Sequence, residues 1–227
     1  MKMNINKYIA QAGLASRRGA DLLIKEKRVK INDKLAVAID KVKAKDQVFV
    51  DGKLIQPVAE KIYLAFNKPV GVITTTDVNS PNNIIDVIKY PKRIFPVGRL
   101  DVNTSGLILL TNDGDFAQFV TKSKQIEKEY LVTVEKPIDD FFLKSLENGL
   151  VLDGFKTLPA KTHQLERKTF TITIVEGKNR QVRRMCEIMR NPVVTLKRIR
   201  IGKLDLGEIS EGKYIELDEE KVKTLFA

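Results

Sequence analysis

Short apolar runs separated by polar, turn-forming residues dominate the chain after residue 61, and runs of β-branched and aliphatic residues predict strands there. The predicted strands are Ile62 to Phe66, Gly71 to Thr75, Arg93 to Val97, Leu107 to Thr111, Tyr130 to Val134, Thr169 to Val175 and Val193 to Ile201. Helical spacing is rarer. It predicts helices near Ile84 to Ile88, Gly114 to Thr121, Asp139 to Asn148, Arg180 to Met189 and Asp218 to Phe226. Unequally spaced strands with scattered helices indicate an α+β fold with a mainly antiparallel sheet.

The beginning of the chain has a different pattern. Apolar residues recur at helical spacing from Ile5 to Ile24, around a turn at Gly13 and a helix cap at Ser16. Two short helices are therefore predicted, the second ending over residues 25–28. Two strand-and-turn pairs follow, at Val29 to Lys34 and at Gln47 to Lys53. A polar, proline-containing segment then separates the two patterns, so we expect domains at 1–56 and 62–227 joined by a linker at 57–61.

Composition and charge narrow the class of protein. The 227 residues are 43% hydrophobic, enough for a substantial core in one or two domains. Lys and Arg number 40 against 29 Asp and Glu, for a formal net charge of +11. Residues 1–61 hold 14 of these cations and 7 of the acids. This excess of positive charge predicts a polyanionic partner, and it favours nucleic acid over a membrane surface. No apolar run is long enough to span a bilayer and no signal-peptide core is present, so a cytoplasmic protein without membrane association is expected.

Metal and disulfide chemistry find little support in the sequence. Cys186 is the single cysteine and His163 the single histidine, so neither an internal disulfide nor a cluster of zinc ligands can form. We expect no metal and no cofactor.

The candidate chemistry is concentrated at Asp101. Residues 98–106 form a polar loop rich in Gly, Asn, Thr and Ser, and this loop runs into the apolar segment Leu107 to Leu110. A loop held by a core strand can present Asp101 to a substrate as a nucleophile or a base, with Arg99 as a neighbouring cation. The alternative is an aspartate that caps a turn and has Arg99 as a surface ion partner.

Four ordered motifs favour the functional interpretation. They are Leu64 to Gly71, the segment Gly98 to Gly114, Glu127 to Val134, and Glu176 to Met185. Together they resemble the pseudouridine synthases that modify ribosomal RNA, in the RsuA, RluB and RluF branch. The basic N-terminal pattern resembles an S4-type (alpha-L) RNA-binding domain. The resemblance implies a catalytic domain with a mixed, mainly antiparallel sheet flanked by helices, and it covers nearly all of residues 4–226.

The resemblance also implies a reaction and a set of catalytic residues. The reaction converts a uridine within RNA to pseudouridine without metal or redox cofactor, on a base taken out of its stack. Asp101 matches the family's catalytic carboxylate, and whether it attacks the base, attacks the sugar or abstracts a proton stays open. Arg99 matches a residue that helps displace the base. Tyr130 matches the tyrosine that stacks on the uracil, and Arg183 matches the arginine that pairs with the carboxylate.

RNA contacts are predicted in two regions. Basic and polar residues gather near the start of the second predicted helix and in the strand after it, and again at the start of the helix after Val175. The predicted RNA-binding residues are Lys7, Ser16, Arg17, Arg18, Arg28, Lys30, Asn32, Lys68, Asn179, Arg180, Gln181 and Arg184. A solvated basic face is the alternative for each region. From Lys178 to Lys203, however, nine Lys or Arg accompany one acid, Glu187, which favours phosphate as the partner.

The predicted function is site-specific pseudouridine formation in ribosomal RNA. Segments 82–88, 92–101 and 183–187 resemble the RluF type, which implies large-subunit (23S) RNA, whereas Asp101 to Thr104 resembles the RluB type. We expect a monomer. The alternatives are a catalytically silent RNA-binding or ribosome-assembly protein, a synthase acting on small-subunit or transfer RNA, and an unrelated hydrolase using Asp101. The first is opposed by the intact set of Arg99, Asp101, Tyr130 and Arg183.

Overall fold

The computed structural model describes residues 2–123 and 125–226, which divide into two compact units. The smaller unit runs to Lys61 and includes Pro91–Arg93 and Asn112–Gly114, and the larger contains the remaining described residues. The larger unit begins at Ile62, where the change in sequence pattern also places the second domain. The sequence pattern does not predict that two short loop segments group with the smaller unit.

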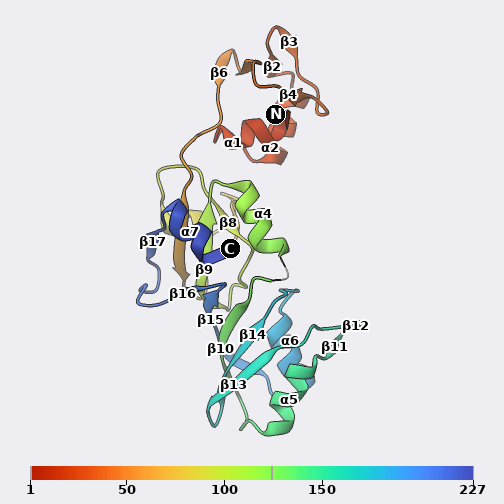
Figure 1. Cartoon of the computed structure of the whole chain (residues 1–227), viewed down its shortest axis with the longest axis vertical. Coiled ribbons are helices and arrows are strands. Elements are labelled where there is room, and N and C mark those ends of the chain that lie inside the picture. Colours follow the sequence, from red (N-terminus) through yellow and green to blue (C-terminus); the bar gives the residue numbers. More distant parts are fainter. Residues whose placement is uncertain (1, 124, 227) are drawn as a thin grey trace. The chain divides into compact units, whose positions relative to one another are not determined.

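The smaller unit packs two helices against short strands (Figure 1). Its elements are β1 (Met3–Asn4), α1 (Ile5–Gln11), α2 (Arg17–Lys25), β2 (Val29–Ile31), β3 (Lys34–Leu35), β4 (Lys41–Val42), β5 (Val48–Val50) and β6 (Lys53–Ile55). Strands β3, β2, β5 and β6 form an antiparallel sheet in that order, and β1 pairs with β4. Ser16 caps α2 by accepting a hydrogen bond from the Gly19 amide at 3.0 Å, as predicted. Ile9, Ile24 and Val48 belong to a core within this unit.

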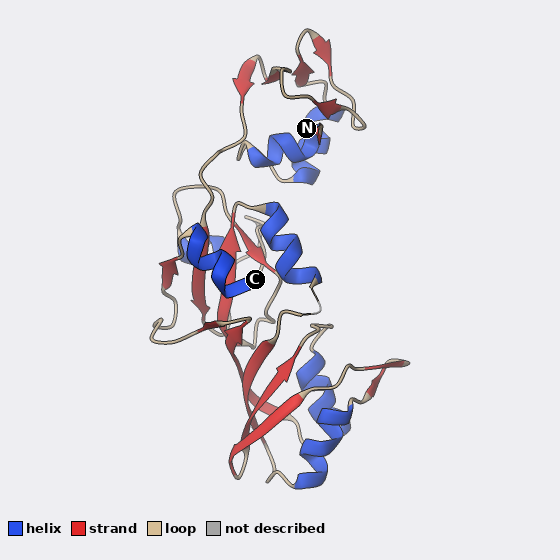
Figure 2. Cartoon of the chain, in the orientation of Figure 1, coloured by secondary structure: helices blue, strands red, loops and turns tan. Residues whose placement is uncertain are grey.

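A mixed sheet runs through the larger unit (Figure 2). Its main path is β13 (Lys161–Glu166), β14 (Thr169–Ile174), β10 (Lys128–Val134), β15 (Val193–Ile201), β9 (Ser105–Thr111), β7 (Tyr63–Lys68) and β17 (Tyr214–Glu216). β8 (Phe95–Val97) also pairs with β9, and β16 (Leu204–Asp205) with β15. Among the strand pairings of this sheet that the described residues form, the β9–β15 pairing alone is parallel. The predicted α+β class with a mixed, mainly antiparallel sheet is therefore confirmed.

Helices cover both faces of this sheet, which explains the continuous apolar run in β9. Ile108 and Leu110 belong to one core, together with residues of α3 (Ile84–Ile88), α5 (Asp140–Asn148) and α6 (Gln181–Ile188). Leu107 and Leu109 belong to a second core, with residues of α4 (Gly114–Lys122) and α7 (Glu219–Phe226). Successive side chains of a strand point to opposite faces, so a strand covered on both sides is apolar throughout. A hairpin of β11 (Val151–Leu152) and β12 (Phe155–Lys156) completes the unit.

One predicted strand is wrong. Residues 71–75 form a loop that makes an isolated bridge between Ile73 and Asn83. Gly71 has a φ of +89°, and the Thr74 hydroxyl donates to the carbonyl of Leu100 at 2.8 Å instead of pointing to a sheet face. The loop therefore supports the Asp101 segment and does not extend the sheet.

Within the described part of the chain, no helix is both long and apolar enough to cross a membrane.

Candidate active site

The Asp101 segment is a loop fixed at both ends. It follows β8 and enters β9, and Gly98 and Gly106 have φ values of +76° and +103°, which favour glycine. A Cβ at Gly106 would lie 2.2 Å from the carbonyl oxygen of Arg198, so β9 approaches β15 closely at this position. Leu100 is buried, and its amide and carbonyl both bond to the Thr74 hydroxyl. Asp101 lies between Leu100 and Gly106, so these contacts leave its backbone little conformational freedom.

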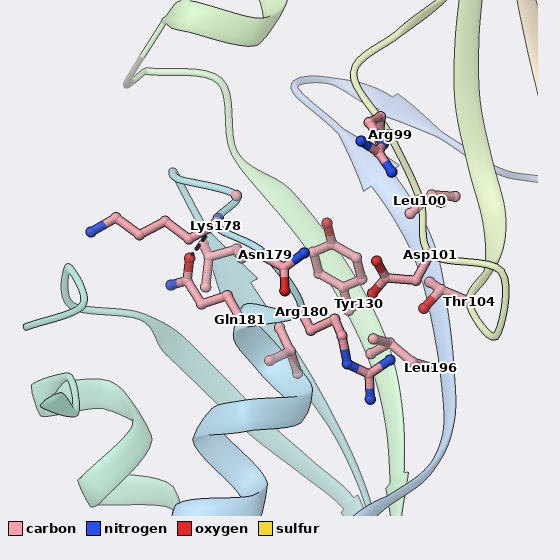
Figure 3. A pocket seen from close by; sticks show the side chains of 13 residues that line it. Arg99, Leu100, Asp101, Thr104, Tyr130, Lys178, Asn179, Arg180, Gln181 and Leu196 are labelled. Carbon is pink, nitrogen blue, oxygen red and sulfur yellow. Dashed lines mark hydrogen bonds between the residues drawn. The ribbon is translucent and has the colours of Figure 1, made fainter. Parts of the chain in front are cut away.

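Asp101 faces a cavity of about 290 Å³. The residues lining it come from the Asp101 loop, from the central strands and from the segment before α6. They are Arg99, Leu100, Asp101, Thr104, Tyr130, Ile174, Gly177, Lys178, Asn179, Arg180, Gln181, Val182 and Leu196. In Figure 3 the Asp101 carboxylate lies beside the Tyr130 ring, and Asn179 and Arg180 approach from the α6 side. The site therefore combines a carboxylate, an aromatic face and cations.

The direction of the Tyr130 side chain is set by a register shift in its strand, β10. The pairing of β10 with β15 shifts register between Glu129 and Tyr130, and the tyrosine then pairs with Arg198. Such bulges redirect side chains at functional sites. The Tyr130 side chain is largely buried in the core, while part of the ring lines the cavity.

Arg183 reaches the loop but not through the expected ion pair. Its guanidinium donates to the Asn103 carbonyl at 2.6 Å and to the Val193 carbonyl at 3.3 Å. In the described residues neither Arg183 nor Arg99 forms an ion pair with Asp101, so the pairing of Arg183 with the carboxylate that the resemblance implies stays a prediction. Burial lowers the pKa of Arg183, and the charge of Asp101 acts in the opposite direction. The Arg183 side chain therefore holds the Asp101 loop through the backbone carbonyl of Asn103.

The segment before α6 is braced from within. The Gln181 side chain accepts from the Lys178 amide at 3.1 Å and donates to Glu176 at 2.8 Å. Gln181 is only 3% exposed, so both ends of its amide are used inside the protein, and the predicted RNA contact is replaced by a bracing role. Arg180 has a φ of +48° at the helix cap, and it lies near Glu187 at 3.9 Å. Asn179 and Arg180 remain exposed at the cavity, as a phosphate contact would require.

The predicted RNA contact of Lys68 is also wrong. Its side chain is fully buried, and its ammonium donates to the carbonyls of Pro69 and Val72, each at 2.9 Å. Burial lowers the pKa of Lys68 to about 8, against the attraction of Asp101 and Glu211. Lys68 therefore shapes the electrostatics around the loop without reaching solvent.

The remaining residues predicted to bind RNA differ in their exposure to solvent and in the contacts that their side chains make within the protein. Arg184 pairs with Asp153, Arg28 pairs with Asp51 and Glu26, and Asn32 bonds to Asp46 and to the Gln47 amide. These pairs are exposed or partly exposed and can be exchanged for phosphate, so the contacts remain predictions. Arg17, Arg18 and Lys30 are exposed, as is part of Ser16 on the cap of α2. Lys7 is partly exposed on α1.

Arg198 is a functional candidate that sequence reasoning missed. It is 5% exposed, and its Nε donates to the Leu107 carbonyl at 2.7 Å. Its guanidinium carbon lies 6.0 Å from the centre of the Tyr130 ring, and its Nη2 is buried without a hydrogen-bond partner among the described residues. The two-residue period of strand β15 could have indicated Arg198. It lies on the same face of the sheet as Leu196, which lines the cavity.

The chain is similar to known proteins over nearly its whole length. A family model described as RNA pseudouridylate synthase matches residues 62–188, and the S4 domain model matches residues 3–48. The dual-specificity RNA pseudouridine synthase RluF of Salmonella typhi is 42% identical over 225 residues, 98% of this chain and 78% of its own length. The ribosomal large subunit pseudouridine synthase B of Bacillus subtilis is 41% identical, covering 98% of this chain and 95% of its own.

A solved structure extends the match to the fold. A crystal structure of a pseudouridylate synthase superposes with a TM-score of 0.72 at 32% identity, over 98% of this chain and 99% of its own. Fold and site thus define an RNA-modifying enzyme with an N-terminal S4 RNA-binding domain. The chain belongs to the RNA pseudouridylate synthase family, which isomerises uridine in RNA to pseudouridine. The predicted family and activity are confirmed.

Proposed function

We propose that this enzyme modifies a uridine of large-subunit ribosomal RNA and uses Asp101 as the reacting carboxylate. The observation that carries the assignment is the position of Asp101, on a rigid loop facing a cavity, with no ion pair to any cation of the described chain. A carboxylate without a tight ion pair keeps its lone pairs available for nucleophilic attack or proton removal. The names of the relatives in Salmonella and Bacillus support the choice of RNA.

The reaction sets requirements that the cavity meets. The bond between N1 of the base and C1′ of the ribose breaks, the base turns, and a bond forms between C5 and C1′. The proton lost from C5 balances the proton gained at N1, so no external oxidant or reductant is consumed. Tyr130 supplies a stacking face for the extruded uracil, and Leu196 supplies an apolar wall. Arg99 and Arg180 line the cavity and in this proposal contact the backbone of the flipped nucleotide.

Positioning is divided between the two units. In the larger unit Arg183 fixes the Asp101 loop by the Asn103 carbonyl. In the smaller, basic unit, exposed Arg17, Arg18 and Lys30 provide a separate phosphate-binding surface. One chain carries every group of the proposed site, so we propose that the enzyme acts as a monomer, in the cytoplasm where ribosomal RNA is processed.

We predict that Asp101→Asn lowers the rate of pseudouridine formation by roughly 100- to 10,000-fold. RNA affinity should stay within a few-fold, because one carboxyl is removed from a surface dominated by cations. Single-turnover kinetics and filter binding on a large-subunit RNA transcript measure the two effects separately. Asp205→Asn, at an exposed position of β16, is the matched control.

The RNA target is tested in cells. Carbodiimide mapping compares strains that lack the protein with strains that carry wild type or Asp101→Asn. Loss of one large-subunit site, restored only by wild type, supports the proposal. Loss of a site in small-subunit or transfer RNA instead would refute the target while leaving the role of Asp101 intact.

A further inference from the structure

A second cavity, of about 380 Å³, lies next to the catalytic cavity. The two cavities share Gly177 and Lys178 in the segment before α6. The walls of the second cavity come from the end of α4, the start of β10, the β12 hairpin and the segment after β14. Four lysines line it, and we call it the lysine groove: Lys122, Lys128, Lys156 and Lys178.

The positive charge of the lysine groove is not neutralised by the protein. Among the described residues, Lys122, Lys128 and Lys156 form no ion pair with a carboxylate. The carboxylate that lines the groove, Glu176, already accepts from the Leu158 amide at 2.9 Å and from the Gln181 side chain at 2.8 Å. Its distance to the Lys178 ammonium is 3.9 Å. A groove with several cations and one engaged acid is suited to an anionic partner.

Lys128 shows the cost of leaving this charge unpaired. It is half-buried at the start of β10, and its ammonium makes one long hydrogen bond, 3.4 Å, to the Val175 carbonyl. Burial lowers the pKa of Lys128, and the nearby charge of Arg198 lowers it further. The adjacent acids, Glu127 and Glu129, are both paired with Arg200. An anion entering the groove would therefore restore favourable interactions that the folded protein alone does not provide.

The groove suits phosphate better than a stacked base. No aromatic residue is among the described residues that line the groove, and the nearby Phe155 ring is already covered by the Lys178 ammonium, 3.3 Å from the ring centre. The same contact holds Lys178 at the junction of the two cavities. A strand whose target nucleotide enters the catalytic cavity would pass this junction, and its next phosphates would meet Lys122, Lys128 and Lys156.

We propose that the lysine groove binds the backbone phosphates of single-stranded RNA on one side of the target uridine. This proposal rests on the proposed function, because it takes the catalytic cavity as the place of the flipped base. It adds contacts made by Lys122 and Lys156, which lie outside the four sequence motifs, and by Lys128, which lies within the Glu127 to Val134 motif but was not predicted to bind RNA. Since these contacts are to phosphates, they set which side of the uridine must be single-stranded and contribute no base specificity.

The test uses the full chain with Asp101→Asn, so that binding is measured without turnover. Affinity for a short oligouridylate and for a large-subunit RNA transcript is determined over a range of salt concentrations. The double variant Lys122→Ala/Lys156→Ala removes two exposed cations from the groove. Lys144→Ala/Lys221→Ala removes the same charge from exposed positions on α5 and α7 and serves as the control. Lys122→Arg/Lys156→Arg keeps the charge in the groove.

The expected result is a several-fold loss of affinity in the double alanine variant. The slope of log affinity against log salt should become shallower by about 0.7 for each phosphate that the variant no longer binds. The arginine variant should bind like the parent, and the control should keep the parent slope. Fragments of the modified RNA, trimmed on either side of the target uridine, then locate the bound phosphates. The affinity of the alanine variant should equal that of the parent when the RNA is trimmed on one side of the target uridine, and should stay lower when it is trimmed on the other side.

Equal slopes for the alanine variant and the control would overturn the proposal, as would a deficit that survives trimming of both sides. The proposed function fails differently. If the wild-type enzyme forms no pseudouridine in the transcript, the target is wrong, while the slopes on oligouridylate still decide whether the lysine groove binds RNA.

Discussion

Three buried cations near Asp101 direct their charged groups to backbone carbonyls. Lys68 donates to Pro69 and Val72, Arg183 to Asn103 and Val193, and Arg198 to Leu107. Each therefore fixes backbone around the catalytic cavity, and the charges of Lys68 and Arg183 also interact with Asp101 without a direct ion pair. The sequence motifs identify two of these cations but cannot give their contacts, because a lysine or arginine reaches carbonyl and carboxylate oxygens equally well.

We predict a pH dependence of stability that originates at Lys68. Its pKa in the folded protein is about 8, below the ordinary value of 10.5, so the unfolded chain binds more protons between those values. The free energy of unfolding should therefore rise with pH in this window, by roughly 1 to 3 kcal/mol in total. Below about pH 8 both states carry the proton and the full cost of burying the charge remains.

Urea unfolding of wild type and Lys68→Met between about pH 7 and pH 10 measures this contribution, since the variant removes the titrating group. The unfolding free energy of wild type minus that of Lys68→Met should increase with pH. Parallel curves would show that the buried ammonium does not titrate in this range.

At the scale of elements, prediction from sequence succeeded where the pattern was strong. The predicted helices at residues 139–148 and 180–189 correspond to α5 and α6. Both have the apolar spacing of a helix, and the Asp139 side chain also caps the start of α5. Prediction failed where tertiary contacts override the pattern. Residues 71–75 are apolar enough for a strand, yet their hydrogen bonds go to the loops around Asn82 and Leu100. Strand β17 was missed because it is short and all three of its residues are exposed.

Helix α6 ends in a turn, Met189 to Pro192, that contains no glycine. Arg190 takes the left-handed position there, with a φ of +54°, and the Asn191 amide bonds to the Cys186 carbonyl at 3.0 Å. The backbone of a glycine turn is thus kept with a residue that is strained in it.

We predict that Arg190→Gly stabilises the larger unit by up to about 1 kcal/mol, because glycine adopts positive φ without a steric cost. Arg190 is exposed, and no side-chain hydrogen bond holds it within the described structure. Arg190→Ala is the matched control, since it removes the same side chain and keeps the strain. Chemical denaturation of the three proteins decides the matter. A gain in Arg190→Ala equal to that in Arg190→Gly would assign the effect to the removed charge.

At the scale of the whole molecule, charge and core are divided unequally between the two units. The smaller unit has its own core around Ile9, Ile24 and Val48, and the larger has two. The first 61 residues have a net charge of +7, against +4 for the rest of the chain. Separate cores allow separate folding, and the charge excess indicates that the smaller unit contributes a large share of the RNA affinity.

We predict that removal of residues 1–56 leaves the larger unit folded but weakens RNA binding and reduces its salt dependence. The cores around β9 lie within the larger unit, so its cooperative unfolding should survive the truncation. Circular dichroism tests folding, and affinity at several salt concentrations tests the charge contribution. Because Asp101 and its cavity are retained, pseudouridine formation should persist at saturating RNA while KM rises. An unchanged salt slope in a folded truncation would show that the larger unit alone, with the lysine groove, provides the phosphate contacts.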